Sequence, residues 1–277
     1  MVFEPKPTDS KRLLRVLSIA GSDSSGGAGI QADIKTATAL GAYAMTAITA
    51  VTVQDTVGVH AVHPIPADIV RAQILACLED IGADAIKIGM LGSVEIAAAV
   101  ADVLHERAAG IPIILDPVIA STSGTALLDA NGIEILRTRL MAIAALVTPN
   151  IPEAEALVGF ECALPNDVLH AGHALLAMGA NAALIKGGHG TGDMFTDTLV
   201  TPQGHRTFEA ARIDTPHTHG TGCTYATAIA VGLARHLSLD DAVACAYAYL
   251  QGAIANAPGY GRGHGPLNHM HALTQKR

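Results

Sequence analysis

The sequence predicts a single α/β domain in which a mainly parallel sheet is covered by helices on both faces. Short β-branched and aliphatic runs alternate with longer Ala-rich segments, and polar or Gly-rich motifs follow the ends of several runs. This alternation is typical of a parallel sheet, whose ligands lie beyond the carboxyl ends of its strands. Half of the 277 residues are hydrophobic and 15% are charged, which excludes a disordered chain.

The individual elements follow from apolar patterning. Between the expected strands, residues 66–80 have helical spacing behind Pro66, and residues 93–107 follow Ser93, a residue type that caps helices. A further helix is expected within 218–237, where a Gly-rich turn leads into an apolar, Ala-rich segment. The runs of strand length are 15–20, 45–53, 85–89, 111–116, 145–149 and 183–187.

Three uncharged stretches approach the length of a membrane span, at 36–54, 215–234 and 242–261. Gly, Pro or polar residues interrupt each of them, so we interpret them as buried helices and strands and expect no membrane association. Residues 1–13 lack a secretory signal, and we expect them to be an extension before one domain at 14–277. The four cysteines form no C-x-x-C pair, which favours reduced thiols in the cytoplasm.

Charge and composition exclude some classes of partner. There are 17 basic against 25 acidic residues, and aromatic residues make up only 3% of the chain, which argues against nucleic-acid binding. The tightest histidine group is His264, His269 and His271. Because no H-E-x-x-H motif is present, a C-terminal loop is a better interpretation of this group than a metal site.

A Gly-rich turn follows the first expected strand. Gly27, Gly29 and Ala32 match the G-x-G-x-x-A dinucleotide fingerprint, with Asp55 at a suitable distance downstream. A small-residue turn that lets a helix pack close to the sheet explains the same residues equally well. An NAD-dependent oxidoreductase therefore stays open as an alternative on this motif.

A second Gly-rich turn offers a phosphate site without a lysine. No Gly-Lys dipeptide occurs, which excludes a Walker A loop, but the turn at 220–222 leads directly into a helix. Unpaired backbone N–H groups and the helix dipole at such a start attract anions. Cys223 lies in this turn, and we expect the helix terminus to lower the pKa of its thiol. A small buried core cysteine is the alternative.

Taken in order, the motifs of the chain resemble those of the ribokinase-like hydroxymethylpyrimidine/phosphomethylpyrimidine kinases. The resemblance spans about residues 14–272 and implies a three-layer α/β/α fold. It implies a phosphotransferase that uses ATP to convert 4-amino-5-hydroxymethyl-2-methylpyrimidine to its monophosphate and then to its diphosphate, in thiamine diphosphate biosynthesis. The motifs are IAGSDSSGGAGIQADIKT, TAVTVQDT, AIKIGMLGS, ILDPV, VTPNIPEAE, IKGGH, DTPHTHGTGCT and GHGPLNHMHAL.

The resemblance also implies roles on the phosphate side of the site. The turn at 220–223 would form the catalytic anion hole, with Cys223 facing the acceptor oxygen. Helix capping is the alternative role for Asn150 and Glu153. The implied set is Gly220, Thr221, Gly222 and Cys223 for catalysis, Lys186, Asn150 and Thr221 for ATP, and Glu153 and Asp116 for Mg²⁺ through water.

On the substrate side, Gln54 is the strongest candidate for recognition. Its amide offers a donor and an acceptor, which can pair with an aminopyrimidine edge of the opposite pattern. Met90 resembles a family residue that packs on the ring, although core packing explains it nearly as well. Gly21 and Asp23 are implied to lie near the substrate.

Other expectations and alternatives accompany the resemblance. It implies a homodimer that takes ATP with Mg²⁺ and a small pyrimidine. Cys223 stands where most ribokinase-like enzymes have Asp, which is typical of the pyrimidine-kinase branch and of relatives that also accept pyridoxal. A pyridoxal kinase therefore stays open, and so does a non-catalytic pyrimidine-binding module.

Overall fold

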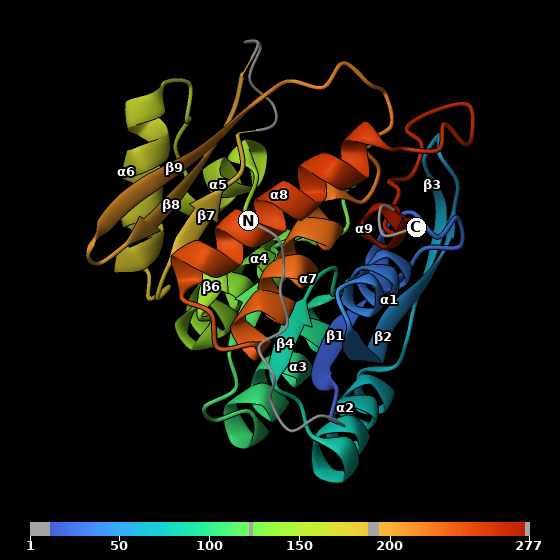
Figure 1. Ribbon diagram of the computed structural model, residues 1–277. Helices are drawn as coiled ribbons and strands as arrows, with labels where there is room; N and C mark the ends of the chain where they lie inside the picture. Colours follow the sequence, from blue (N-terminus) through green and yellow to red (C-terminus); the bar gives the residue numbers. More distant parts are fainter. Residues whose placement is uncertain (1–11, 122–123, 188–193, 275–277) are drawn as a thin grey trace.

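The protein, described by a computed structural model over residues 12–121, 124–187 and 194–274, is built on one nine-stranded sheet (Figure 1). The strand order is β3-β2-β1-β4-β5-β6-β7-β8-β9, and the strands from β2 to β7 in that order pair in parallel. β3 and β8 run antiparallel to their inner neighbours. The strands are β1 (Leu14–Ser22), β2 (Ala42–Gln54), β3 (Val59–Pro64), β4 (Ala85–Ile88), β5 (Ile113–Leu115), β6 (Leu146–Val147), β7 (Ala183–Ile185), β8 (Met194–Thr201) and β9 (Gly204–Ala211).

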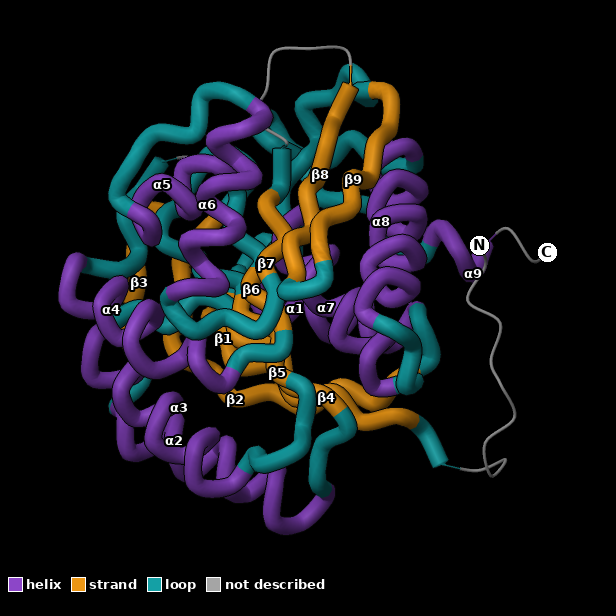
Figure 2. The backbone as a smooth tube through the Cα atoms, turned by 90° about the vertical axis from the view of Figure 1, so that its left-hand side faces the viewer, coloured by secondary structure: helices purple, strands orange, loops and turns teal. Residues whose placement is uncertain are grey.

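Helices cover both faces of the sheet, and Figure 2 shows the three layers from the side. One face is covered by α1 (Gly29–Ala39), α7 (Thr221–Ala234) and α8 (Leu239–Ala255). The other is covered by α2 (Ala67–Ala76), α3 (Val94–Arg107), α4 (Ala130–Ile135), α5 (Ile151–Val158) and α6 (Pro165–Ala177). The short α9 (His271–Thr274) contacts α8. The predicted three-layer α/β/α fold is confirmed.

The core consists of two aliphatic layers, one on each side of the sheet. In β1, Leu17 and Ile19 join one layer while Val16 joins the other, as expected when successive side chains of a strand alternate. Both layers are made largely of Ala, Val, Ile and Leu, in keeping with a chain that has no Trp. The fold therefore depends on close aliphatic packing.

The elements expected from apolar patterning are present. Each predicted strand run overlaps one of β1, β2, β4, β5, β6 and β7. The segment 66–80 forms α2 and then a π-helical turn at Cys77–Ile81. Ser93 caps α3 by accepting the N–H of Ile96 at 3.2 Å. β1 begins at Leu14, and residues 1–11 of the expected extension lie outside the described residues, so the domain boundary stays a prediction.

The long uncharged stretches belong largely to a strand of the sheet and to helices that cover it. Segment 36–54 is mostly β2, 215–234 contains α7, and 242–261 contains most of α8. No helix in the described part of the chain has both the length and the apolar character needed to cross a bilayer. Strands β3, β8 and β9 were not predicted, because polar residues interrupt their apolar runs.

Candidate active site

The implied phosphate-side residues meet at the carboxyl ends of neighbouring strands. Asp116 follows β5, Asn150 follows β6 and Lys186 follows β7, so the parallel sheet places them along one edge. Lys186 Nζ donates to Asp116 Oδ1 at 2.8 Å. Gly222 lies against this pair, because a Cβ added there would be 3.2 Å from Lys186 Nζ and 3.4 Å from Asp116 Oδ2. The structure therefore brings the lysine, the carboxylate and the glycine turn together.

The turn before α7 has a backbone that requires glycine. Gly220 is the N-cap of α7 with φ of 84°, a conformation that disfavours side chains. A Cβ added at Gly220 would lie 1.9 Å from the carbonyl oxygen of Gly27. The two Gly-rich turns thus pack backbone against backbone. The N–H groups of the first turn of a helix have no intrahelical acceptor, and that of α7 contains no acidic side chain, so it suits an anion.

Asn150 and Glu153 form a capping box at the start of α5. Asn150 Oδ1 accepts the N–H of Glu153 at 2.8 Å, and Glu153 Oε2 accepts the N–H of Asn150 at 2.9 Å. The capping role considered from the sequence is therefore real. It also holds the carboxylate of Glu153 in one place at the edge of the sheet.

The carboxylates beside Lys186 have shifted pKa values. Burial raises the pKa of Glu153 to about 7, and the charge of Asp116 acts in the same direction against the opposing Lys186. Burial also disfavours ionised Asp116, but Lys186 and Lys87 outweigh it and lower the pKa of this carboxyl. Mg²⁺ prefers oxygen ligands and uses few carboxylates, so this acidic pair fits the ion. These two carboxylates do not belong to a larger ligand cluster, because the described residues contain no group of three or more His, Cys, Asp or Glu that could hold a metal.

Cys223 differs from its prediction. Burial raises the pKa of its thiol to about 11, and Asp33 and Asp116 act in the same direction while Lys87 opposes them. The expectation of a lowered pKa was wrong, because burial and the two nearby carboxylates outweigh Lys87 and the hydrogen bond from the Gly29 N–H, which lower it. The side chain keeps part of its surface exposed. At neutral pH Cys223 is a protonated thiol.

A buried ion pair behind Cys223 was missed by the sequence analysis. Lys87 of β4 pairs with Asp33 of α1 at 2.9 Å. Asp33 also accepts hydrogen bonds from Ser18 Oγ at 2.5 Å and Thr227 Oγ1 at 2.7 Å. The available signal was a lysine inside the apolar run at 85–89, since lysine is rarely buried without a partner.

The implied substrate-side residues lie at the ends of β1, β2 and β4. Gln54 is the last residue of β2, and Asp23 directly follows β1. Gly21 contacts Met90, because a Cβ added at Gly21 would be 2.8 Å from the Met90 methyl group. A pocket is lined by Gln54, Asp55, Thr56, Val57, Gly58, Ser121, His219 and His264. Gln54 therefore lines a small cleft, whereas Gly21, Asp23 and Met90 are not among its lining residues.

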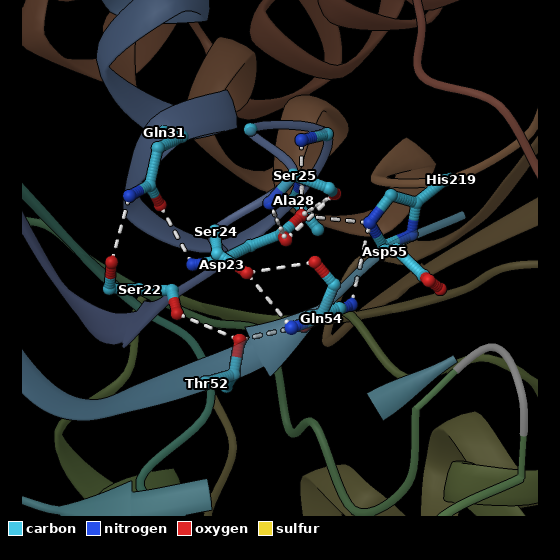
Figure 3. Close-up of polar contacts among 12 residues, drawn as sticks. Ser22, Asp23, Ser24, Ser25, Ala28, Gln31, Thr52, Gln54, Asp55 and His219 are labelled. Atoms are coloured by element: carbon cyan, nitrogen blue, oxygen red, sulfur yellow. Dashed lines mark hydrogen bonds and ion pairs between the residues drawn. The ribbon is translucent and has the colours of Figure 1, made fainter. Parts of the chain in front are cut away.

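His219 joins this pocket to the glycine turn. Its Nε2 lies 2.8 Å from Asp23 Oδ2 and 3.4 Å from Gln54 Nε2. Dashed lines in Figure 3 join His219 to both side chains. His219 directly precedes Gly220, so the pocket and the anion turn adjoin each other. The sequence analysis did not select His219, although its place in the HTHGTGC motif was the available signal.

The geometry argues against dinucleotide binding at the first Gly-rich turn. Asp23 Oδ2 accepts the N–H groups of Gly27 at 3.0 Å and Ala28 at 2.8 Å, so the chain's own carboxylate takes the donors a pyrophosphate would need. Asp55 instead organises the turn between β2 and β3 by accepting the N–H groups of Val57 and Gly58. The oxidoreductase alternative loses both of its supports.

The three C-terminal histidines have separate partners. His264 Nδ1 lies 3.1 Å from the carbonyl of Pro216, and His269 Nε2 lies 3.0 Å from Thr224 Oγ1. His271 Nδ1 lies 3.0 Å from the carbonyl of Asn268. Burial lowers the pKa of His269 to about 4, so it is neutral at physiological pH.

Comparisons with known proteins agree with this geometry. The profile of the family described as Phosphomethylpyrimidine kinase matches residues 23–268. A hydroxymethylpyrimidine/phosphomethylpyrimidine kinase of Streptomyces coelicolor is 45% identical over 94% of this chain and 96% of its own length. An ADP complex of Bacillus subtilis pyridoxal kinase superposes with a TM-score of 0.88 at 35% identity, covering 95% of this chain and 99% of its own. A phosphomethylpyrimidine kinase from Clostridium difficile gives a TM-score of 0.78 at 39% identity, covering 87% and 99%.

Proposed function

The chain belongs to the phosphomethylpyrimidine kinase family, and on that premise we propose how its residues carry out the reaction. The protein is a phosphotransferase that uses ATP to phosphorylate a hydroxymethylpyrimidine and then its monophosphate, in thiamine biosynthesis. The observation that carries the assignment of residues is the contact between Gln54 and His219, which sets the candidate pyrimidine pocket beside the anion turn.

The anion turn would hold the phosphoryl group in transit. The N–H groups of Thr221, Gly222 and Cys223 lie at the positive end of α7, where developing negative charge is stabilised. Lys186 would neutralise the ATP phosphates from the adjoining strand end, and Asn150 would contact ATP from the start of α5. Phosphoryl transfer is mainly positioning and charge neutralisation, which these groups can supply.

Asp116 and Glu153 would hold Mg²⁺ through bound water. The ion, when bound, neutralises phosphate charge. A test is the Mg²⁺ concentration that gives half-maximal rate in Glu153→Gln, which can keep the acceptor for the Asn150 N–H. An increase of about tenfold supports this role. The same requirement as in the wild-type protein would refute it.

Cys223 would position the acceptor oxygen rather than act as the base. A thiol with a pKa of about 11 is protonated at neutral pH. The first transfer needs a proton removed from an alcohol, while the second uses a phosphate that is already anionic. Cys223→Ala should therefore slow the two half-reactions by similar factors. A loss confined to the alcohol step would show instead that the Cys223 thiolate acts as the base that removes the alcohol proton.

On the substrate side, Gln54 would pair with the aminopyrimidine edge. Met90 would pack on the ring, and Gly21 and Asp23 would lie near it. The decisive assay couples ATP consumption to a panel of hydroxymethylpyrimidine, its monophosphate and pyridoxal. Turnover of both pyrimidines with release of ADP supports the assignment. Binding without turnover would instead favour a non-catalytic module.

Pyridoxal phosphorylation is a second candidate activity. It is favoured by the close superposition with the Bacillus subtilis pyridoxal kinase, which exceeds that with the Clostridium difficile enzyme. The sequence relative from Streptomyces coelicolor is more similar in identity and favours the pyrimidine. A higher kcat/KM for pyridoxal than for the pyrimidine alcohol would reverse this order.

We further propose a homodimer that works in the cytoplasm. Support for the dimer is a pair of exposed apolar side chains on β2, Val51 and Val53, which are 46% and 60% exposed. The four cysteines are all free thiols, which suits a reducing compartment. Light scattering on the wild-type protein and on Val53→Lys tests the dimer, which the charged variant should weaken.

A further inference from the structure

His219 Nε2 has two polar neighbours that cannot both form hydrogen bonds with it in their present orientation. His219 Nε2 faces Asp23 Oδ2 at 2.8 Å and Gln54 Nε2 at 3.4 Å (Figure 3). An ionised carboxylate only accepts hydrogen bonds, and an amide NH₂ group only donates them. A single ring nitrogen cannot donate to one of these neighbours and accept from the other at the same time.

The charge of Asp23 determines whether His219 Nε2 carries a proton. Its buried carboxylate already accepts from Ser25 Oγ and from the N–H groups of Gly27 and Ala28. Burial alone would raise the pKa of Asp23, but His219 and these donors outweigh it and lower the pKa. The carboxylate is therefore ionised, and His219 Nε2 must carry the proton that it donates. This one proton is shared in a three-centre arrangement, mainly with Asp23 at 2.8 Å and more weakly with the Gln54 amide at 3.4 Å, so the amide must present an acceptor to it. This holds for a neutral ring protonated at Nε2 and for an imidazolium.

The far end of the Gln54 amide gives an independent argument. Thr52 Oγ1 lies 3.0 Å from the carbonyl oxygen of Ser22 and 3.2 Å from the amide atom placed as Gln54 Oε1. A hydroxyl has one proton, and the Ser22 carbonyl can only accept it. Thr52 can then only accept from Gln54, which requires the NH₂ group at this end. Amide oxygen and nitrogen are assigned from such networks, since their shapes are nearly identical.

We propose that Asp23 and His219 fix the Gln54 amide with its oxygen toward His219 and its nitrogen toward Thr52. His219 is then a positioning residue that sets the order of donor and acceptor presented to the substrate. One lone pair of Oε1 and one N–H of Nε2 remain for a ligand. This inference rests on the proposed role of Gln54 in pyrimidine binding.

The fixed amide selects one ring edge. A 4-aminopyrimidine offers its amino N–H to the Gln54 oxygen and its ring nitrogen to the Gln54 N–H. The matching 4-oxo compound offers a carbonyl and a ring N–H in the opposite order. It can pair only if the amide turns over, which breaks the bonds to His219 and Thr52. A site built to pair polar atoms strongly rejects a ligand that leaves them unpaired.

Kinetic discrimination tests the proposal. The ratio of kcat/KM for the 4-amino substrate over its 4-oxo analogue is measured in the wild type, His219→Leu and His219→Gln. Leucine has no donor, so the ratio should fall at least about tenfold, mostly through KM for the analogue. Glutamine keeps an N–H donor and should retain the ratio within about threefold. An unchanged ratio in His219→Leu would overturn the proposal.

A second measurement does not depend on turnover. Histidine ¹⁵N spectra of the ligand-free protein report which ring nitrogen of His219 carries a proton, with His219→Gln identifying the signal. We expect a proton on Nε2 at pH 7, and an unprotonated Nε2 would overturn the proposal even in an inactive sample. A wild-type protein that phosphorylates no pyrimidine while showing this proton would refute the proposed function alone.

Discussion

Lys87 and Asp33 form an ion pair of 2.9 Å in which the two side chains are 0% and 1% exposed. The lysine belongs to β4 and the carboxylate to α1, and Thr227 of α7 donates to the same carboxylate. The pair therefore joins the sheet to the two helices that carry the Gly-rich turns. Its charges also act on Cys223 and, through Lys87, on Asp116.

Lys87→Met should destabilise the fold by about 3–5 kcal/mol, because it leaves Asp33 as a buried charge without its partner. Urea unfolding measures the change. The double variant Lys87→Met with Asp33→Asn removes both charges. Its amide oxygen accepts from one of the two hydroxyls of Ser18 and Thr227 and its NH₂ group can donate to the other, so it should recover more than half of the loss. A single variant within about 1 kcal/mol of the wild type would contradict this.

Asp197→Asn should stabilise the protein in a pH-dependent way. Asp197 accepts the N–H of Gly187 at 2.9 Å, and burial raises its pKa from 3.8 to about 6. The folded-state pKa lies above the unfolded value, so the protonated Asp197 carboxyl contributes its full stability below about pH 4. As pH rises through 6, the buried carboxyl ionises and the free energy of unfolding falls.

The asparagine variant can keep the acceptor and has no such loss. At pH 8 it should exceed the wild type by about 1–3 kcal/mol, and near pH 4 the difference should be small. Unfolding curves at several pH values give this comparison. A difference that stays constant from pH 4 to 8 would rule out titration of Asp197 as the cause.

Gly220→Ala should remove activity and cost stability. The added Cβ would lie 1.9 Å from the Gly27 carbonyl oxygen, so the two turns would have to separate. Gly110→Ala is a matched control, since Gly110 also has a positive φ, of 78°, and has no atom within 4 Å of an added Cβ. The control should lose only about 1 kcal/mol and stay active. Equal effects in the two variants would show that backbone strain, not the clash, dominates.

Alkylation of Cys223 should be slow at neutral pH. With a thiol pKa of about 11, the iodoacetamide rate should rise about tenfold per pH unit from 7 to 10 without a plateau. The measurement needs Cys77, Cys162 and Cys245 replaced by Ser. The same protein carrying Cys223→Ala is the blank. A plateau near pH 8 would show instead that the helix terminus does lower the pKa.

Local patterns predicted much of the fold. β-branched runs identified the parallel strands, and the GTG sequence identified the turn before α7, because both are properties of neighbouring residues. Strands β8 and β9 were missed because neither is a continuous apolar run: β8 has Thr196, Asp197 and Thr198 in its middle, and β9 begins with polar residues. Strand patterning alone does not show which side of an edge strand is covered.

The electrostatics of the site could not be read from neighbours in the sequence. His219 and Asp23 are 196 residues apart, and no local pattern pairs them. The start of α7 was expected to lower the pKa of the Cys223 thiol. Its pKa is instead set by burial and by charged residues on β4, on α1 and after β5. A sequence motif can identify the residues of a site. Their protonation states depend on how close charged residues from other motifs lie in the folded protein.

The pocket takes one wall from the turn after β2 and another from the residues near the end of the chain, where the N–H of His264 donates to the carbonyl of Thr56 at 2.7 Å. A ribosome must therefore translate the chain as far as His264 before the pocket can close. During refolding, the time at which enzymatic turnover returns would report when the segment around His264 docks. The time at which the sheet forms can be measured separately.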